Sequence, residues 1–290
     1  MTVKLKMSEY RSTSFCQFGD MYVGRPGTPV AVTATSWAAS LSRPRVESLT
    51  EILIVRRILT DLIPAAFSIP LRAGRATDAR HYPPSQPSGR LFVFAHGAGA
   101  GQTHAFMVSV ADGLAARGVD VVTFDFSYMH ERRPVPDRAP ALESCFETVI
   151  EAARGRKGLA DRRLFIGGKS MGGRMATHLG ARGMAGLEGI VALGYPLHPP
   201  GKPDQLRVAH LSSLAVPILV VQGERDAFGT PAELAPFLRG MPAGATLHVV
   251  EGGDHSLTAR GRRAPDQLAR VSDVVAGWMN GVADGRTVGC

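Results

Sequence analysis

Short apolar runs that alternate with helical segments are the feature of this 290-residue chain that most restricts its fold. We predict a strand buried on both faces at Leu91–Ala95, and further strands at Val119–Phe124, Leu164–Gly167, Gly189–Leu193, Pro217–Gln222 and Thr246–Val250. We predict helices at Thr103–Arg117, Ala139–Arg154, Met171–Ala181, Pro231–Arg239 and Pro265–Asn280. Repeated strand–helix–strand units build a parallel sheet with helices on both faces, so the predicted fold class is α/β.

The beginning of the chain lacks this pattern. Residues 1–65 mix Ser, Thr, Arg and Pro without sustained periodicity, apart from an amphipathic helix predicted at Glu47–Leu62. We expect them to form a basic N-terminal extension, with disorder and partial helix both left open. The main domain is predicted over residues 66–283, starting with a strand at Phe67–Leu71 and a turn-rich connection at Thr77–Arg90, and residues 284–290 form a C-terminal tail.

The positive charge of the chain is concentrated in its first third. The formal net charge is +8, of which residues 1–90 contribute +6 and residues 91–290 only +2. A surface that binds nucleic acid gathers cations along the domain that makes the contacts. Because the excess lies mostly outside the alternating segment, no nucleic-acid partner is expected.

Cysteine usage and hydropathy indicate the environment of the protein. Cys16, Cys145 and Cys290 are odd in number and widely spaced, which favours the reducing cytoplasm over a disulfide framework. No apolar run approaches the roughly 20 residues that span a bilayer, and none follows the N-terminal lysines as a secretory signal requires. His96 and His104 have no cysteine or carboxylate partners at ligand spacing, so neither a metal nor another cofactor is expected.

Ser170 lies in the pattern G-x-S-x-G, between a predicted strand and a predicted helix. A strand that turns sharply into a helix and exposes a serine leaves little room for side chains on either side, which explains Gly168 and Gly172. The amide of Met171, at the start of the helix, is placed to donate a hydrogen bond to an oxyanion. We therefore predict Ser170 as a nucleophile.

Two nucleotide-binding motifs compete with this interpretation and fail. The run Gly168-Lys169-Ser170 resembles the end of a P-loop, but Arg163 stands where the first glycine of that motif belongs. The glycine-rich loop after the first buried strand resembles a dinucleotide fingerprint, but Gln102 or His104 replaces its third glycine in the two possible registers. We predict instead that the Ala98 amide in this loop is the second oxyanion donor.

An acid and a histidine follow two later strands. Asp226 comes just after the strand Pro217–Gln222, and His255 just after Thr246–Val250. Ligand sites in parallel sheets lie beyond the carboxyl ends of the strands, so Ser170, Asp226 and His255 should meet there. Their order is that of a serine hydrolase triad on the α/β-hydrolase fold. The alternative acids are Glu224 and Asp254.

Several segments resemble the α/β-hydrolase-like family of testis-expressed protein 30 and NSL complex subunit 3. They are residues 165–176 around the serine, Gly194–Lys202, Gln222–Thr230 and Gly253–Ser256. The resemblance covers roughly residues 67–280 and implies the fold and a hydrolase-like site, although some relatives serve in protein complexes. Dienelactone-hydrolase-like enzymes are similar more distantly, but they carry a cysteine where this chain has Ser170.

The chain leaves little room for a lid. The connection Gly194–Ala215 is only 22 residues long and rich in proline, so we expect no large cap domain and an open pocket. Candidate pocket residues are His96, Tyr128, Tyr195, Pro196 and His198. We predict a serine hydrolase of the carboxylesterase or thioesterase type, acting on a small-molecule acyl substrate. The alternative is a non-catalytic scaffold of the same fold that binds a protein partner.

Overall fold

A computed structural model describes residues 21–25, 28–32 and 64–285. The chain divides into two compact units, Met1–Arg56 and Arg57–Cys290. In the first unit, β1 (Met21–Arg25) pairs with β2 (Thr28–Val32) in an antiparallel hairpin that no sequence pattern predicted. The helix predicted at Glu47–Leu62 lies outside the described residues. The domain boundaries predicted after residues 65 and 283 stay predictions.

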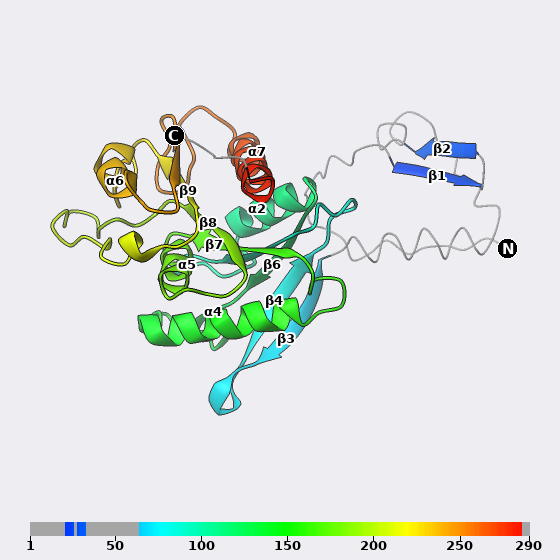
Figure 1. The fold of residues 1–290 in the computed structure, drawn as a ribbon, viewed down its shortest axis with the longest axis horizontal. Helices are drawn as coiled ribbons and strands as arrows, with labels where there is room; N and C mark the ends of the chain where they lie inside the picture. The colour runs from blue at the N-terminus through cyan, green and yellow to red at the C-terminus, as the bar shows by residue number, and fades with distance from the viewer. Residues whose placement is uncertain (1–20, 26–27, 33–63, 286–290) are drawn as a thin grey trace. The chain divides into compact units, whose positions relative to one another are not determined.

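The second unit contains an eight-stranded sheet. Its strands are β3 (Ala65–Pro70), β4 (Ala76–Tyr82), β5 (Arg90–Ala95), β6 (Val119–Phe124), β7 (Arg163–Lys169), β8 (Leu187–Leu193), β9 (Ile218–Gly223) and β10 (Ala245–Val250). They lie in the order β10-β9-β8-β7-β5-β6-β4-β3 (Figure 1). The strands from β10 to β6 are parallel, whereas β4 runs antiparallel to both β6 and β3.

Helices cover both faces of this sheet (Figure 1). They are α2 (Ala105–Ala115), α3 (Ser127–His130), α4 (Ala139–Arg154), α5 (Met171–Ala181), α6 (Pro231–Leu238) and α7 (Ala264–Ala283). The side chains of β5 alternate between the two faces: Leu91 and Val93 pack in the core with α4, α5 and α6, and Phe92 and Phe94 in the core with α2 and α7. This two-sided burial explains why β5 reads as a continuous apolar run.

The turn-rich connection predicted at Thr77–Arg90 is wrong in its first half, because β4 occupies it. The strand is polar, yet its polar groups find partners in the sheet. The buried Thr77 hydroxyl donates to the Asp125 carbonyl, and the His81 ring lies 3.0 Å from the carboxylate of the buried Asp120. Hydrogen bonding to neighbouring segments therefore replaces the apolar pattern that would have marked a strand.

The connection between β8 and β9 contains turns and one short 3-10 helix, η3 (Leu211–Ser213). Within residues 64–285 no large cap domain covers the sheet edge. The predicted α/β class, a mostly parallel sheet with helices on both faces, is confirmed. In the described part of the chain, no helix combines the length and the apolar character that crossing a membrane requires.

Candidate active site

Ser170 stands at a sharp turn between β7 and α5. Its backbone has φ 49° and ψ −111°, a strained conformation that costs of the order of 1–3 kcal/mol. A side chain on Gly168 would meet the Ala95 carbonyl oxygen at 2.6 Å, and one on Gly172 would press against the same Ala95 backbone. The two glycines thus let the turn pack against the end of β5, which holds the serine at the edge of the sheet.

The structure brings the three predicted triad residues together by hydrogen bonds. The Nε2 atom of His255 lies 2.9 Å from Ser170 Oγ. On the other side of the ring, Nδ1 lies 2.9 Å and 2.8 Å from the two carboxylate oxygens of Asp226. The Phe228 ring stacks on the imidazole with centroids 4.1 Å apart, which further restricts the ring.

The Asp226 carboxylate is buried and held by two more donors. The Phe228 backbone N–H donates to one oxygen at 2.8 Å, and the Gln222 amide donates to the other at 2.9 Å. Gln222, completely buried at the end of β9, also donates to the Tyr195 and Gly229 carbonyls and accepts from the Tyr195 N–H. Such charge-assisted hydrogen bonds stabilise an ionised carboxylate inside a protein.

The side chains of the two alternative acids accept hydrogen bonds from the backbone instead. Glu224 accepts a hydrogen bond from the Gly252 N–H at 2.7 Å. Asp254 accepts from the N–H groups of Ser256 and Thr258 at 2.8 Å and 3.2 Å. Both carboxylates stabilise turns, so Asp226 is the acid that contacts the histidine.

The glycine-rich loop after β5 is fixed by a buried histidine. The His96 Nε2 atom accepts a hydrogen bond from the Phe126 N–H at 2.9 Å, and Nδ1 lies 2.7 Å from the Gly97 carbonyl oxygen, to which it donates. One accepting and one donating nitrogen define a neutral imidazole, and burial lowers the pKa of His96 accordingly. Ala98 and Met171, the predicted oxyanion donors, both line the cleft in front of Ser170.

This cleft has a volume of about 770 Å³. Its walls come from the glycine-rich loop, α2, α5, α7 and the segments that follow β8, β9 and β10. Lys169 also lines it, although its Nζ atom is buried and has no hydrogen-bond partner among the described residues. Burial lowers the pKa of Lys169 to about 8, against the opposing effect of the negative charges of Asp226 and Asp254.

The predicted pocket residues need correction. Pro196 lines the cleft, whereas His96, Tyr128, Tyr195 and His198 are not among its lining residues and are buried in the protein. The Tyr195 hydroxyl donates to the Arg207 carbonyl, and His198 Nδ1 lies 2.9 Å from the Pro199 carbonyl oxygen. The Tyr195 hydroxyl and His198 Nδ1 thus bind the backbone and are not directed into the cleft.

The sequence interpretation missed several residues of this region, among them Gln222, Arg174 and Arg207. Gln222 carried a recognisable signal, because it is a polar residue that ends an otherwise apolar strand. Arg174 and Arg207, which line the cleft, carried none, since arginine is usually exposed and unremarkable in a sequence. Within the described segments, no group of three or more His, Cys, Asp or Glu side chains is arranged to hold a metal ion.

A family model described as "Alpha/beta hydrolase domain" matches residues 88–280. The chain belongs to this family. The match runs from just before β5 to within α7 and so contains the serine turn, Asp226 and His255. It leaves β3 and β4 outside.

Solved structures show the same α/β-hydrolase fold. A dienelactone hydrolase from Anabaena variabilis is 17% identical, with a TM-score of 0.62 over 76% of this chain and 98% of that chain. An alpha-beta serine hydrolase homologue from Coxiella burnetii is 14% identical, with a TM-score of 0.61 over 74% and 97%. An α/β serine hydrolase without lid from Xanthomonas campestris is 19% identical, with a TM-score of 0.56 over 74% and 94%. At such identities the likeness establishes the fold alone.

Proposed function

We propose that this α/β hydrolase cleaves a carboxylic ester or thioester through an acyl-enzyme intermediate. The observation that carries the proposal is the continuous hydrogen-bonded series from Asp226 through His255 to Ser170 at the floor of an open cleft. Nucleophile, base and orienting acid are each within hydrogen-bond reach of the next, as acyl transfer requires.

The proposed reaction begins when Ser170 Oγ attacks the acyl carbon and His255 Nε2 takes the hydroxyl proton. Asp226 stabilises the imidazolium that forms. The amides of Ala98 and Met171 donate to the negative oxygen of the tetrahedral intermediate. His255 then gives its proton to the leaving alcohol or thiol, and water releases the acyl group from Ser170 by the same steps in reverse.

A fluorophosphonate probe tests the nucleophile. Wild type should be labelled and should cleave short p-nitrophenyl esters or the matching thioesters. Ser170→Ala should not be labelled, and its turnover should fall by at least about 10⁴-fold. The matched control is Ser144→Ala, whose serine lies on α4 away from the cleft and which should be labelled like wild type.

His255→Ala tests the base in the same assay. It should lose turnover while its circular dichroism spectrum and melting temperature stay those of a folded protein. If folded wild type is neither labelled nor active on any ester or thioester, the non-catalytic scaffold is the better interpretation. The resemblance to the testis-expressed protein 30 family, some members of which serve in protein complexes, stays a prediction.

A further inference from the structure

Two walls of the cleft, one on either side of Ser170, carry different kinds of side chain. The wall formed by α2 and α7 is apolar and presents Phe106, Met107 and Leu268. The opposite wall, formed by α5 and the connection between β8 and β9, presents Arg174 and Arg207. A molecule that fills the cleft therefore meets apolar surface at one end and two guanidinium groups at the other.

These two arginines have no negative partner. No Asp or Glu is among the cleft-lining residues, and neither arginine forms an ion pair with any residue that the structure describes. Arg207 makes one long hydrogen bond, 3.5 Å from Nη1 to the Pro196 carbonyl oxygen. Both residues line the same cleft, and burial together with the positive charge of Arg174 lowers the pKa of Arg207.

Both arginines are held by the elements that form the site. Arg174 lies one helical turn after the nucleophile, and its backbone N–H donates to the Ser170 carbonyl at 3.0 Å. Side chains of a helix lean toward its N-terminus, so the Arg174 side chain leans toward Ser170. The Arg207 N–H donates a hydrogen bond to the Leu197 carbonyl, and the Arg207 carbonyl accepts one from the Tyr195 hydroxyl. The Tyr195 N–H in turn donates to the Gln222 side chain.

Two guanidinium groups that line one cleft without a carboxylate partner among the described residues can together bind an anion. Arginine binds carboxylates through paired, charge-assisted hydrogen bonds, and a partly buried position strengthens them. We propose that the substrate of the hydrolytic site is an anionic ester, with a carboxylate bound by Arg174 and Arg207 and an apolar group against α2 and α7. This inference rests on the proposed ester-cleaving function and names the substrate class for it.

Matched pairs of esters test the inference. One pair carries the charge in the acyl half: mono-p-nitrophenyl glutarate and its neutral methyl ester. The other carries it in the alcohol half: 4-acetoxybenzoate and its neutral methyl ester. For each ester, kcat/KM is divided by its rate constant with hydroxide to remove intrinsic reactivity. Wild type should prefer the anionic member of one pair by about tenfold or more, as a charge-assisted hydrogen bond provides.

Variants connect this preference to the two arginines. Arg174→Gln and Arg207→Gln should each lower the ratio of anionic to neutral kcat/KM by about tenfold, and Arg174→Lys by less because it keeps the charge. Arg182→Gln is the matched control: it removes the same charge from the end of the same helix, outside the cleft, and should keep the wild-type ratio. A wild-type ratio near one for both pairs, or a ratio that neither glutamine variant changes, overturns the inference.

Failure of this inference is separable from failure of the proposed function. If Ser170 is labelled by the fluorophosphonate but both ester pairs give ratios near one, only the anionic substrate is ruled out. If wild type is neither labelled nor active, hydrolysis itself is ruled out. Calorimetry with glutarate then shows whether the two arginines bind an anion. Glutarate should bind to wild type and more weakly to Arg174→Gln. If glutarate does not bind to wild type, the anion site is ruled out.

Discussion

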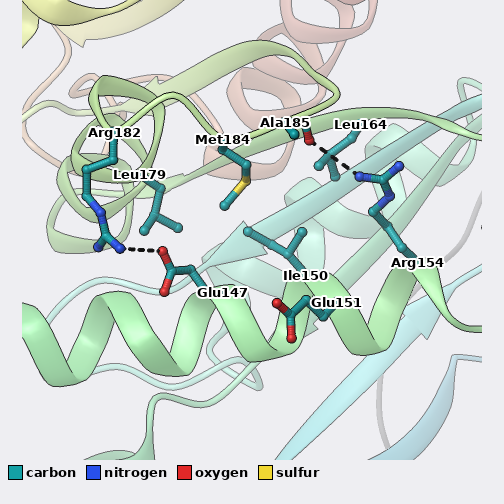
Figure 2. A pocket seen from close by; sticks show the side chains of 9 residues that line it. All are labelled: Glu147, Ile150, Glu151, Arg154, Leu164, Leu179, Arg182, Met184 and Ala185. Carbon is teal, nitrogen blue, oxygen red and sulfur yellow. Dashed lines mark hydrogen bonds and ion pairs between the residues drawn. The ribbon is translucent and has the colours of Figure 1, made fainter.

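Two hollows lie at opposite edges of the parallel strands, and their charged side chains are arranged differently. The cleft at the carboxyl edge contains Ser170 and the unpaired Arg174 and Arg207. The second hollow, which we call the rear groove, has a volume of about 310 Å³ and is lined by Glu147, Ile150, Glu151, Arg154, Leu164, Leu179, Arg182, Met184 and Ala185 (Figure 2). It lies between α4 and α5, where β7 begins.

In the rear groove, charged and polar groups satisfy one another. Arg182 lies 2.9 Å from the Glu147 carboxylate, and Arg154 reaches the Ala185 carbonyl at 3.5 Å across an apolar floor (Figure 2). Among the described residues, by contrast, none of the arginines and lysines that line the cleft forms an ion pair, and the buried Lys169 ammonium has no hydrogen-bond partner. Unpaired buried charge is costly. The comparison indicates that the rear groove contributes to the fold, whereas the cleft keeps its charges available for a ligand.

The largest effect is expected at Gln222, where the cleft depends on a buried polar network. Gln222→Leu keeps the approximate volume but removes the donor to Asp226 and to the Gly229 carbonyl, and it leaves the Tyr195 N–H without its acceptor. Chemical denaturation should show a loss of about 2–4 kcal/mol in the free energy of unfolding. The value of kcat should fall by about tenfold or more, because the acid no longer holds the histidine firmly.

Gln222→Glu tests whether Gln222 positions the Asp226 carboxylate or only supports the surrounding structure. This variant keeps an acceptor for the Tyr195 N–H but places a second carboxyl beside Asp226. Adjacent carboxyls raise the pKa of one of them, so the acidic limb of the pH profile of kcat/KM should move to higher pH. An unchanged pH profile in an active variant would show that Gln222 does not act on the acid.

An intermediate effect of opposite sign is expected at Lys169. Lys169→Met keeps the long apolar stem and removes the buried ammonium. Its free energy of unfolding at pH 7 should exceed that of wild type by roughly 1–3 kcal/mol. The control is Lys157→Met at an exposed position, which should change stability by less than about 0.5 kcal/mol.

The sign of the pH dependence provides a second check on Lys169. Its pKa in the folded protein, about 8, lies below its ordinary value of 10.5. Between these two values the unfolded chain binds more protons at this site, so wild type gains stability from it as pH rises. The advantage of Lys169→Met should thus be largest below pH 8 and disappear near pH 10.5. An advantage that is constant with pH would mean that the ammonium is not the cause.

The smallest effect is expected in the rear groove. Glu147→Gln weakens the pair with Arg182, whose side chain is 56% exposed and also contacts Glu143. Partly exposed pairs contribute little, so the free energy of unfolding should change by less than about 1 kcal/mol, and less at high salt. Ester turnover should stay that of wild type. A large loss of turnover would show that the rear groove affects the cleft, and it would contradict the assignment of a purely structural role to the rear groove.

The sequence predicted the parallel part of the fold well, because strands buried on both faces appear as continuous apolar runs. The predicted strand at Leu91–Ala95 corresponds to β5 within one residue. The sequence interpretation failed for β4, whose polar residues find their partners only in the folded sheet, and it did not predict α3, a helix of four residues after β6. Elements that depend on distant partners leave no local pattern.

The candidate site, like the fold, was predictable from the sequence in part. The sequence placed Ser170, Asp226 and His255 directly after three predicted strands, and their meeting follows from the geometry of a parallel sheet. It could not distinguish residues that line the cleft from those behind it. Pro196 and His198 are two residues apart and both buried, yet Pro196 lines the cleft and His198 does not, because this difference depends on the path of the connection after β8.

The distribution of the site over the chain has a consequence for protein engineering. Ser170, Asp226 and His255 follow β7, β9 and β10, whereas the cleft walls come largely from α2, α7 and the connection after β8. The residues proposed to react and the residues that line most of the cleft are thus carried by separate parts of the polypeptide. A redesigned wall can retarget the catalyst to new compounds while the strained serine turn and its two glycines stay untouched.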